Sequence, residues 1–441
     1  MIENLIINYN PGILKERIIL MSDRMIIEGG HRLQGDIYVS GSKNAALPIL
    51  IATLLTKEEC VIENVPFLED VKITLEILES LGVHVEHHED GTVVTKVVDE
   101  SSVIAPYELV RKMRASICVL GPLLAKRGKA QVSMPGGCVI GLRPIDLHLK
   151  GMRALGADIE IEHGYVYAHA PKLVGNAMFL GGAFGSTVLG TANVMMSATL
   201  AEGTTVIENA ACEPEVQDLA KFLIGMGAKI EGAGSPHLVI HGVHELHGTH
   251  HRIIPDRIEA GTFIAAAAIT EGDIIIHGAE LEHLFAVTDQ LQHIGVKIQK
   301  LESGDVRVRG SKSYSPCTLT TLPYPGFPTD LQAQFVSILS LVPGISMVTE
   351  KVYPDRFMHV AELNRMGAQI RKEGSTAIIE GVESLSGAPV IASDLRASAA
   401  LVLAGLVARG ETIIEQIYHL DRGYDRLDEK FAKLGAHIHR E

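Results

Sequence analysis

Leu81-Gly82-Val83-His84-Val85 is the first of six similar phrases in this 441-residue chain. Each phrase runs Leu, Met or Ile, then Gly, a small residue, any residue, and Ile or Val. The other five begin at Leu155, Met226, Ile294, Met366 and Leu434. Their glycines lie 68 to 74 residues apart, and such even spacing indicates an internal structural repeat.

The same order of elements surrounds every phrase. An apolar segment of helical length comes first, at residues 46–55, 116–125, 193–201, 262–270, 335–342 and 398–408. A β-branched strand follows, then an amphipathic helix ending at the repeated glycine, then further strands. Another strand precedes each apolar helix. The pattern predicts six β-α-β-α-β-β units, each with its apolar first helix in the interior.

Six units divide naturally into two domains of three. The sixth unit ends at Glu441 without its last strand, and residues 25–29 resemble that strand. The N-terminal segment is therefore expected to close the sixth unit, so the chain should cross between the halves near residues 42–43 and 254–255. We predict one domain at residues 43–254, carrying units one to three. Residues 1–42 and 255–441 should form the second domain, with ligands bound in the cleft between the two.

Composition excludes several classes of protein. A net charge of −14 argues against a nucleic-acid or anionic-membrane surface. Five scattered cysteines favour a reduced, cytosolic setting over a disulfide framework. The longest apolar run, near residues 397–408, has the length of a core helix, and residues 1–24 show no cleavage-type signal and have no assignable function. The glycine-rich motifs of dinucleotide-binding and P-loop sites do not occur between a strand and a helix in this sequence, so neither kind of site is supported.

Basic residues recur where strands give way to helices, at one end of the parallel elements. Ligand sites cluster at such ends, and helix N-termini favour anions. A cleft lined by these residues would bind a highly anionic substrate pair. They are Lys43, Arg114, Arg143, Arg356, Arg396 and Arg422.

Plainer interpretations of the same residues remain open. Asp330 could be a helix N-cap. Glu213 and Glu215 could complement a helix dipole. Three arginines could form surface ion pairs with neighbouring aspartates, namely Arg356 with Asp355, Arg396 with Asp394 and Arg422 with Asp421.

Histidines and cysteines carry weaker signals. The clusters His84/His87/His88 and His247/His250/His251 lack a companion ligand at metal spacing, so no metal site is predicted. Cys60, Cys118 and Cys317 have the surroundings of small core residues. Cys138 differs, because it lies in the glycine-rich stretch 135–148 with Arg143 nearby, which favours a thiolate.

Ten motifs in order resemble the UDP-N-acetylglucosamine 1-carboxyvinyltransferase (MurA) family of enolpyruvyl transferases. They include GSKNAALPIL from Gly41, PGGCVIGLRPIDLH from Pro135, LAEGTTVIENAACEPE from Leu200, FPTDLQAQF from Phe327 and SDLRASAALVLAG from Ser393. The resemblance runs from about Met25 to the C-terminus. It implies a two-domain inside-out α/β barrel built from the six repeats, three per domain, with the active site in the interdomain cleft.

The resemblance also implies a reaction. The enolpyruvyl group of phosphoenolpyruvate would pass to the 3-hydroxyl of UDP-N-acetylglucosamine with release of phosphate. This is the first committed step of peptidoglycan synthesis, in the cytoplasm, and it uses no metal or organic cofactor. Preorganised cations in a closed cleft would stabilise the oxocarbenium-like or tetrahedral state beside the leaving phosphate.

Roles for individual residues follow from the matched motifs. Cys138 would be the acid-base thiol of a mobile lid, able to form a covalent adduct and open to attack by a fosfomycin-type epoxide. Lys43 and Asn44 would contact phosphoenolpyruvate, with Asn44 also near the sugar. Its phosphate and carboxylate would be held by Arg143, Arg396 and Arg422, with Arg356 completing the ring of cations.

The nucleotide sugar would have its own set of residues. Arg114 would contact it, Val352 and Asp330 would touch the N-acetylglucosamine, and Asp330 would take the proton of the 3-hydroxyl. The uridine site would be lined by Arg143, Pro144, Ile145, Asp146 and Leu147. The segment Ser186-Thr187-Val188-Leu189 departs from the family's usual Ser-Val-Gly-Ala-Thr pattern, which weakens assignments there but not binding through backbone groups.

Two alternatives remain open from the sequence. One is the shikimate-3-phosphate version of the same reaction, which the PGGC…RPIDLH motif disfavours. The other is a non-catalytic paralogue that senses UDP-N-acetylglucosamine. Retention of Lys43, Cys138, Asp330, Arg396 and Arg422 together argues against a sensor.

Overall fold

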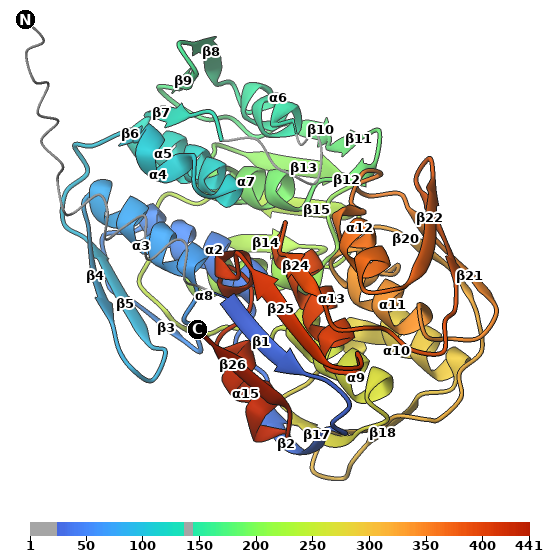
Figure 1. The fold of residues 1–441 in the computed structure, drawn as a ribbon. Coiled ribbons are helices and arrows are strands. Elements are labelled where there is room, and N and C mark those ends of the chain that lie inside the picture. Colours follow the sequence, from blue (N-terminus) through green and yellow to red (C-terminus); the bar gives the residue numbers. More distant parts are fainter. Residues whose placement is uncertain (1–23, 136–143) are drawn as a thin grey trace, which may run out of the picture.

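The computed structural model describes residues 24–135 and 144–441. Within them lie six four-stranded sheets, one for each predicted unit (Figure 1). The sheets of units one to three have the orders β16(His250–Arg252)-β3(Cys60–Glu63)-β5(Val93–Val97)-β4(Val83–His87), β6(Ile104–Ala105)-β7(Lys129–Ser133)-β9(Tyr165–His169)-β8(Asp158–Glu162) and β10(Ala177–Phe179)-β13(Thr204–Glu208)-β15(His237–His241)-β14(Lys229–Glu231).

Units four to six repeat this arrangement. Their orders are β2(Gln34–Tyr38)-β17(Asp273–His277)-β19(Val306–Arg309)-β18(Lys297–Lys300), β20(Thr318–Thr321)-β21(Ile345–Glu350)-β23(Thr376–Glu380)-β22(Gln369–Glu373) and β24(Pro389–Ile391)-β25(Glu411–Glu415)-β1(Arg24–Glu28)-β26(His437–Arg440). Each of the six sheets has one parallel pair and two antiparallel pairs. A two-residue hairpin adds β11(Gly181–Gly182) and β12(Gly185–Ser186).

The N-terminal strand closes the sixth sheet, which confirms the expectation from the sequence. β1 pairs antiparallel with both β25 and β26. The strands that precede the first helices of units one and four are exchanged, in line with the predicted crossing points near residues 42–43 and 254–255. β2 pairs in parallel with β17 of unit four, and β16 pairs in parallel with β3 of unit one.

The two segments that follow these exchanged strands run side by side. Gly41 forms an antiparallel bridge with Pro255. On either side of that bridge, Ser42 N–H donates to the carbonyl of Ile254 (2.7 Å) and Asp256 N–H donates to the carbonyl of Ser40 (2.8 Å). The chain therefore passes twice between the two halves through one hydrogen-bonded pair of strands.

The apolar first helices are buried, as predicted. They are α2(Lys43–Ala52), α5(Leu120–Arg127), α7(Val188–Ala198), α9(Arg257–Ile269), α11(Gln332–Leu339) and α13(Leu395–Gly405). Every residue of α9 is buried. Short 3-10 turns precede two of these helices, Arg114–Val119 before α5 and Thr329–Leu331 before α11, and a third, Thr53–Leu55, follows α2.

The amphipathic second helices cover the outside of these bundles. They are α3(Glu69–Ser80), α6(Asp146–Ala154), α8(Pro214–Gly225), α10(Phe285–Ile294), α12(Met358–Arg365) and α15(Leu427–Lys433). The shorter remaining elements are α4(Tyr107–Val110), α14(Tyr418–Asp421) and the 3-10 turn Leu281–Leu284. All six repeated glycines have positive φ, between 82° and 120°, because each ends its helix in a left-handed conformation.

Buried apolar side chains form two separate clusters. One is drawn from residues 45–253 and the other from residues 25–37 and 258–436. We propose that these clusters are the cores of the two domains expected at 43–254 and at 1–42 plus 255–441. No helix in the described part of the chain is both long and apolar enough to cross a membrane.

Candidate active site

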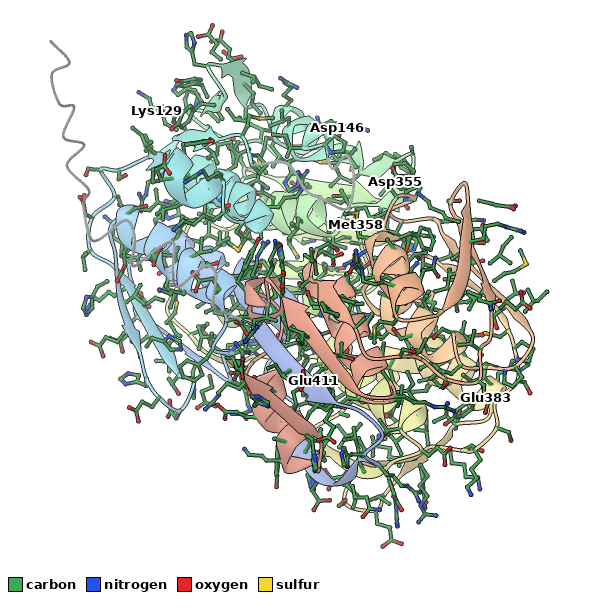
Figure 2. All side chains as sticks on the ribbon, in the orientation of Figure 1. Lys129, Asp146, Asp355, Met358, Glu383 and Glu411 are labelled. Carbon is green, nitrogen blue, oxygen red and sulfur yellow. The ribbon has the colours of Figure 1, made fainter. Side chains whose placement is uncertain are left out.

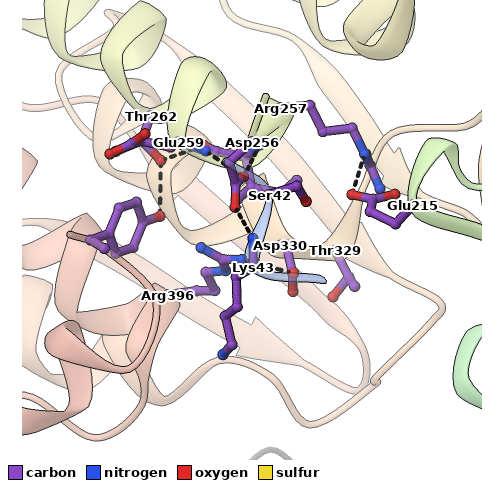
Figure 3. Close-up of polar contacts among 12 residues, drawn as sticks. Ser42, Lys43, Glu215, Asp256, Arg257, Glu259, Thr262, Thr329, Asp330 and Arg396 are labelled. Atoms are coloured by element: carbon purple, nitrogen blue, oxygen red, sulfur yellow. Dashed lines mark hydrogen bonds and ion pairs between the residues drawn. The ribbon is translucent and has the colours of Figure 1, made fainter. Parts of the chain in front are cut away.

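Lys43 is held at the point where the chain crosses between the halves. Its backbone N–H donates to Oδ2 of Asp256 (3.1 Å). Oδ1 of the same carboxylate accepts from the backbone N–H groups of Ile258 and Glu259, so Asp256 is also the N-cap of α9. One carboxylate thus ties the first residue of α2 to the start of α9, and the buried Lys43 lies near Arg396 (Figure 3).

The ammonium group of Lys43 pairs with a carboxylate that the sequence argument did not single out. Nζ lies 2.7 Å from Oδ2 of Asp70, and Oδ1 of Asp70 accepts a hydrogen bond from Nε of Arg422 (2.9 Å). Burial lowers the pKa of Lys43, and Arg396 and Arg422 lower it further, while Asp70 opposes all three. Burial would raise the pKa of Asp70, but attraction to Lys43 and Arg422 outweighs it and lowers that pKa.

A second carboxylate, Asp330, lies between two further arginines. Its Oδ1 is 2.6 Å from Nη1 of Arg356, and its Oδ2 is 3.1 Å from Nη2 of Arg396. Burial opposes ionisation of Asp330, but Arg396 and Arg356 together hold its pKa well below its usual range. The N-cap interpretation is wrong, because Asp330 is the second residue of a 3-10 turn whose N-cap is Pro328.

The Arg396 guanidinium retains donors that no described residue accepts. Its side chain is 2% exposed and lies 5.2 Å from the centre of the Tyr424 ring. Nη2 bonds to Asp330, whereas Nε and Nη1 make no hydrogen bond with the residues in 24–135 and 144–441. Buried donors are normally paired, so these two are suited to an anionic ligand.

Glu350, fully buried at the end of β21, organises the neighbouring loop. Its Oε1 accepts hydrogen bonds from the hydroxyl of Thr321 (2.6 Å) and from the backbone N–H groups of Val352 (2.8 Å) and Tyr353 (2.9 Å). Its Oε2 accepts from the hydroxyl of Thr329 (2.9 Å), which in turn accepts from Nη1 of Arg356. This single carboxylate therefore fixes Val352 and the turn that carries Asp330.

The residues expected to bind the nucleotide lie on the other half. Asp146 opens α6 and is labelled in Figure 2, after exposed Pro144 and buried Ile145. Leu147 packs against Gly182 of β11: its Cδ1 atom lies 3.3 Å from the position that a Cβ atom on Gly182 would take. The remaining expected residues, Asn44, Arg114, Ser186, Thr187, Val188 and Leu189, are all half-buried.

The segment 186–189 begins beside a residue that reaches the opposite half of the molecule, Gly185. Thr187 is the N-cap of α7, with its hydroxyl accepting from the N–H of Gly190 (3.2 Å). A Cβ on Gly185, whose φ is +100°, would come within 2.9 Å of Pro323. Cys138 and Arg143, the two remaining predicted site residues, lie outside the described residues.

The ion pairs predicted between neighbours in the sequence are wrong in their partners. Asp355 pairs with Lys372 and Asp421 with Arg440, while Asp394 is the N-cap of α13. Arg396 and Arg422 instead reach carboxylates from other units, Asp330 and Asp70, while Arg356 reaches Asp330 at the start of the first helix of its own unit. Helix N-termini converge at the cleft, so the cations meet acids that are distant in sequence.

Glu215 likewise does more than complement a helix dipole. Its Oε1 accepts a hydrogen bond from Nε of Arg257 (2.9 Å), joining α8 of one core to α9 of the other (Figure 3). Glu213, nearby and buried, lies 3.5 Å from the backbone N–H of Tyr324, and burial raises its pKa. Both carboxylates therefore belong to the contact between the two halves.

One group of described side chains has the composition of a metal site, but not its geometry. Glu28, His31 and His437 bring potential ligand atoms within 4.8 Å of one another. However, the two imidazole rings stack with centroids 3.6 Å apart and planes 25° from parallel. Histidine ligates in its ring plane, and two nearly parallel planes do not meet within ligand distance, so we assign no metal there.

The arrangement as a whole is a built anion site. Near Asp256 and Asp394, which add negative charge, four cations from α2, the loop before α12, α13 and the end of α14 pair directly with two carboxylates. They are Lys43, Arg356, Arg396 and Arg422, against Asp70 and Asp330. Such a site can bind a substrate carrying several negative charges, with ionised Asp330 available to accept a proton.

Comparison with known proteins agrees with this geometry. Residues 27–431 match the family model of EPSP synthase (3-phosphoshikimate 1-carboxyvinyltransferase). Two relatives named UDP-N-acetylglucosamine 1-carboxyvinyltransferase are 56% identical over 420 residues, from Methylacidiphilum infernorum, and 55% identical over 421 residues, from Desulfosudis oleivorans. Each alignment covers 95% of this chain and 99% of the relative.

Solved structures show the same fold. The enolpyruvyl transferase NikO from Streptomyces tendae superposes with a TM-score of 0.87 at 25% identity, covering 95% of this chain and 99% of NikO. EPSP synthase from Acinetobacter baumannii superposes with a TM-score of 0.73 at 19% identity, covering 95% of this chain and all of that structure.

Proposed function

The chain belongs to the EPSP synthase family of enolpyruvyl transferases, and within it to the UDP-N-acetylglucosamine 1-carboxyvinyltransferases; we propose the residues with which it carries out that reaction. The reaction transfers the enolpyruvyl group of phosphoenolpyruvate to the 3-hydroxyl of UDP-N-acetylglucosamine and releases phosphate. The observation that carries this conclusion is 52–56% identity to relatives of that name over 95–96% of the chain. It also favours this reaction over the shikimate-3-phosphate alternative.

Phosphoenolpyruvate is proposed to bind among the cations of the cleft. We propose that Lys43 and Arg422 hold its phosphate and that Arg396 holds its carboxylate through Nε and Nη1. The support for Arg396 is its burial and the two donors that no described residue accepts. Because these cations are fixed by carboxylates before substrate binds, they need little reorganisation as charge moves onto the leaving phosphate.

Asp330 is proposed to take the proton from the sugar 3-hydroxyl. Its pairing with Arg356 and Arg396 keeps it ionised at neutral pH, the state in which a carboxylate can accept a proton. Glu350 supports this role, because it fixes both the turn of Asp330 and the backbone of Val352, which is proposed to contact the N-acetylglucosamine.

Protonation of C3 of phosphoenolpyruvate is proposed to come from Cys138, with Arg143 beside it; both lie outside the described residues. The uridine diphosphate is proposed to lie along Arg114, the segment 143–147, and the segment 186–189. As an enzyme of peptidoglycan synthesis it would act in the cytoplasm, in cell wall biogenesis, and so in cell shape and division.

A phosphate-release assay tests the proposal directly. Purified protein is incubated with phosphoenolpyruvate and either UDP-N-acetylglucosamine or shikimate 3-phosphate, and inorganic phosphate is measured with time. Release only with the nucleotide sugar is expected. Binding of UDP-N-acetylglucosamine without any phosphate release would instead indicate a non-catalytic sensor.

A further inference from the structure

Asp70 is a buried acid of the cleft, and the sequence predicts no role for it. It is the second residue of α3, and its residue is 2% exposed. Its two carboxylate oxygens are divided between two cations, Oδ2 to Lys43 and Oδ1 to Arg422. A buried carboxylate with one cation on each oxygen is fully engaged and fixes both partners.

The two partners of Asp70 come from different cores. Lys43 and Asp70 lie beside Ala45 and Val71, which belong to the cluster drawn from residues 45–253. Arg422 lies between Leu420 and Tyr424, which belong to the other cluster. The hydrogen bond from Arg422 to Asp70 therefore crosses from one half of the molecule to the other, at the level of Lys43.

Without Asp70, the ammonium of Lys43 and the guanidinium of Arg422 would have no carboxylate in an ion pair among the described residues. Lys43 is buried and faces Arg396 and Arg422, and both burial and these arginines favour its neutral form. Asp70 is the group that opposes them. Each bond to Asp70 uses a single donor, so other donors of the ammonium and guanidinium groups remain for a ligand.

We propose that Asp70 is a positioning residue for the phosphate of phosphoenolpyruvate, which draws Arg422 across the cleft and holds it beside a charged Lys43. The proposal rests on the function proposed above and adds a residue to it. Asp70 does not touch the reacting atoms. It makes the two-cation phosphate site depend on the two halves being together.

Asp70→Asn tests this role, because the amide keeps the shape and loses the charge. The KM for phosphoenolpyruvate should rise about tenfold to hundredfold, as expected for loss of charge-assisted hydrogen bonds. The Kd for UDP-N-acetylglucosamine, measured by calorimetry, should stay within threefold of wild type. The alkaline limb of the kcat/KM profile should move to lower pH, because Lys43 loses the partner that keeps it charged.

Two further variants sharpen the test. Glu215→Gln removes the other buried ion pair between the halves, with Arg257, and should leave the alkaline limb in place. Asp70→Glu keeps the charge and should recover part of the lost affinity for phosphoenolpyruvate. Thermal unfolding shows whether Asp70→Asn folds. If it does not fold, Asp70→Glu is used in its place, and its KM for phosphoenolpyruvate is expected to be at least threefold above that of wild type.

An unchanged KM for phosphoenolpyruvate in a folded variant would overturn the proposal. So would an equal loss of affinity for UDP-N-acetylglucosamine, which would indicate general damage to the cleft. Failure of the proposed function is a different result, namely wild-type protein that releases no phosphate from the two substrates.

Discussion

Replacing Asp330 with asparagine keeps the shape of the side chain and removes the proposed proton acceptor. Loss of a positioned general base costs about 10² to 10⁴ in rate, or about 3–5 kcal/mol of barrier. The structure adds a second expectation. Asp330 occupies one nitrogen each of Arg356 and Arg396, so its neutralisation leaves two buried cations more attractive to an anion. We therefore expect kcat to fall by 10² or more while the KM for phosphoenolpyruvate does not rise.

Steady-state phosphate release at saturating UDP-N-acetylglucosamine separates these two effects. Asp355→Asn is the matched control, because Asp355 lies on the adjacent loop with its side chain 78% exposed and paired only with Lys372 among the described residues. That variant should behave as wild type. A kcat for Asp330→Asn within threefold of wild type would refute the role of Asp330 as base.

Three other expectations can be measured independently. A fosfomycin-type epoxide should modify Cys138 in preference to the other four cysteines, because burial raises the pKa of Cys60 to about 11 and that of Cys118 to about 12, and also raises the pKa of Cys212 and Cys317. Peptide mass spectrometry that finds any of these four thiols modified as fast as Cys138 would contradict this. Burial lowers the pKa of His359 to about 4, so the imidazole binds a proton more readily in the unfolded chain than in the folded protein. The free energy of unfolding should therefore fall by about 2 kcal/mol between pH 7 and pH 5. In urea unfolding, His359→Gln should reduce this dependence of stability on pH. Glu350→Gln should weaken UDP-N-acetylglucosamine binding about tenfold by calorimetry, and unchanged affinity would show that the loop holds its shape without that carboxylate.

The repeat made much of the fold predictable. Six phrases at even spacing predict six units, and the resemblance of residues 25–29 to a closing strand predicts its pairing, because both depend on local patterns of apolar residues and glycine. The predicted crossing points near residues 42–43 and 254–255 put β2 and β16 in the halves opposite the helices that follow them, but they did not identify the strands with which β2 and β16 pair. A strand carries no local mark of its partner, and the linear repeat assigns each strand to the helix that follows it.

In the candidate site, the sequence predicted which residues carry the positive charges but not which carboxylates pair with them. Lys43, Arg356, Arg396 and Arg422 could be found from their places at strand-to-helix turns. Their partners could not, because ion pairing depends on distance in space, and neighbours such as Asp355 are directed elsewhere. Asp70 could have been found, since it lies at the start of the second helix of unit one, close to the place that Arg356 takes just before the second helix of unit five.

Closure of the sixth sheet by β1 dictates when the protein can finish folding on the ribosome. Arg24 and Glu441 bond to each other through backbone and side chain although they stand 417 positions apart. Residues 43–254 contain every strand of their three sheets and can therefore fold as soon as they are made. β1 and β2 are made earlier but must wait, β2 for β17 and β1 for β25 and the final strand of the chain. The first part of the described chain to be synthesised is thus among the last to fold.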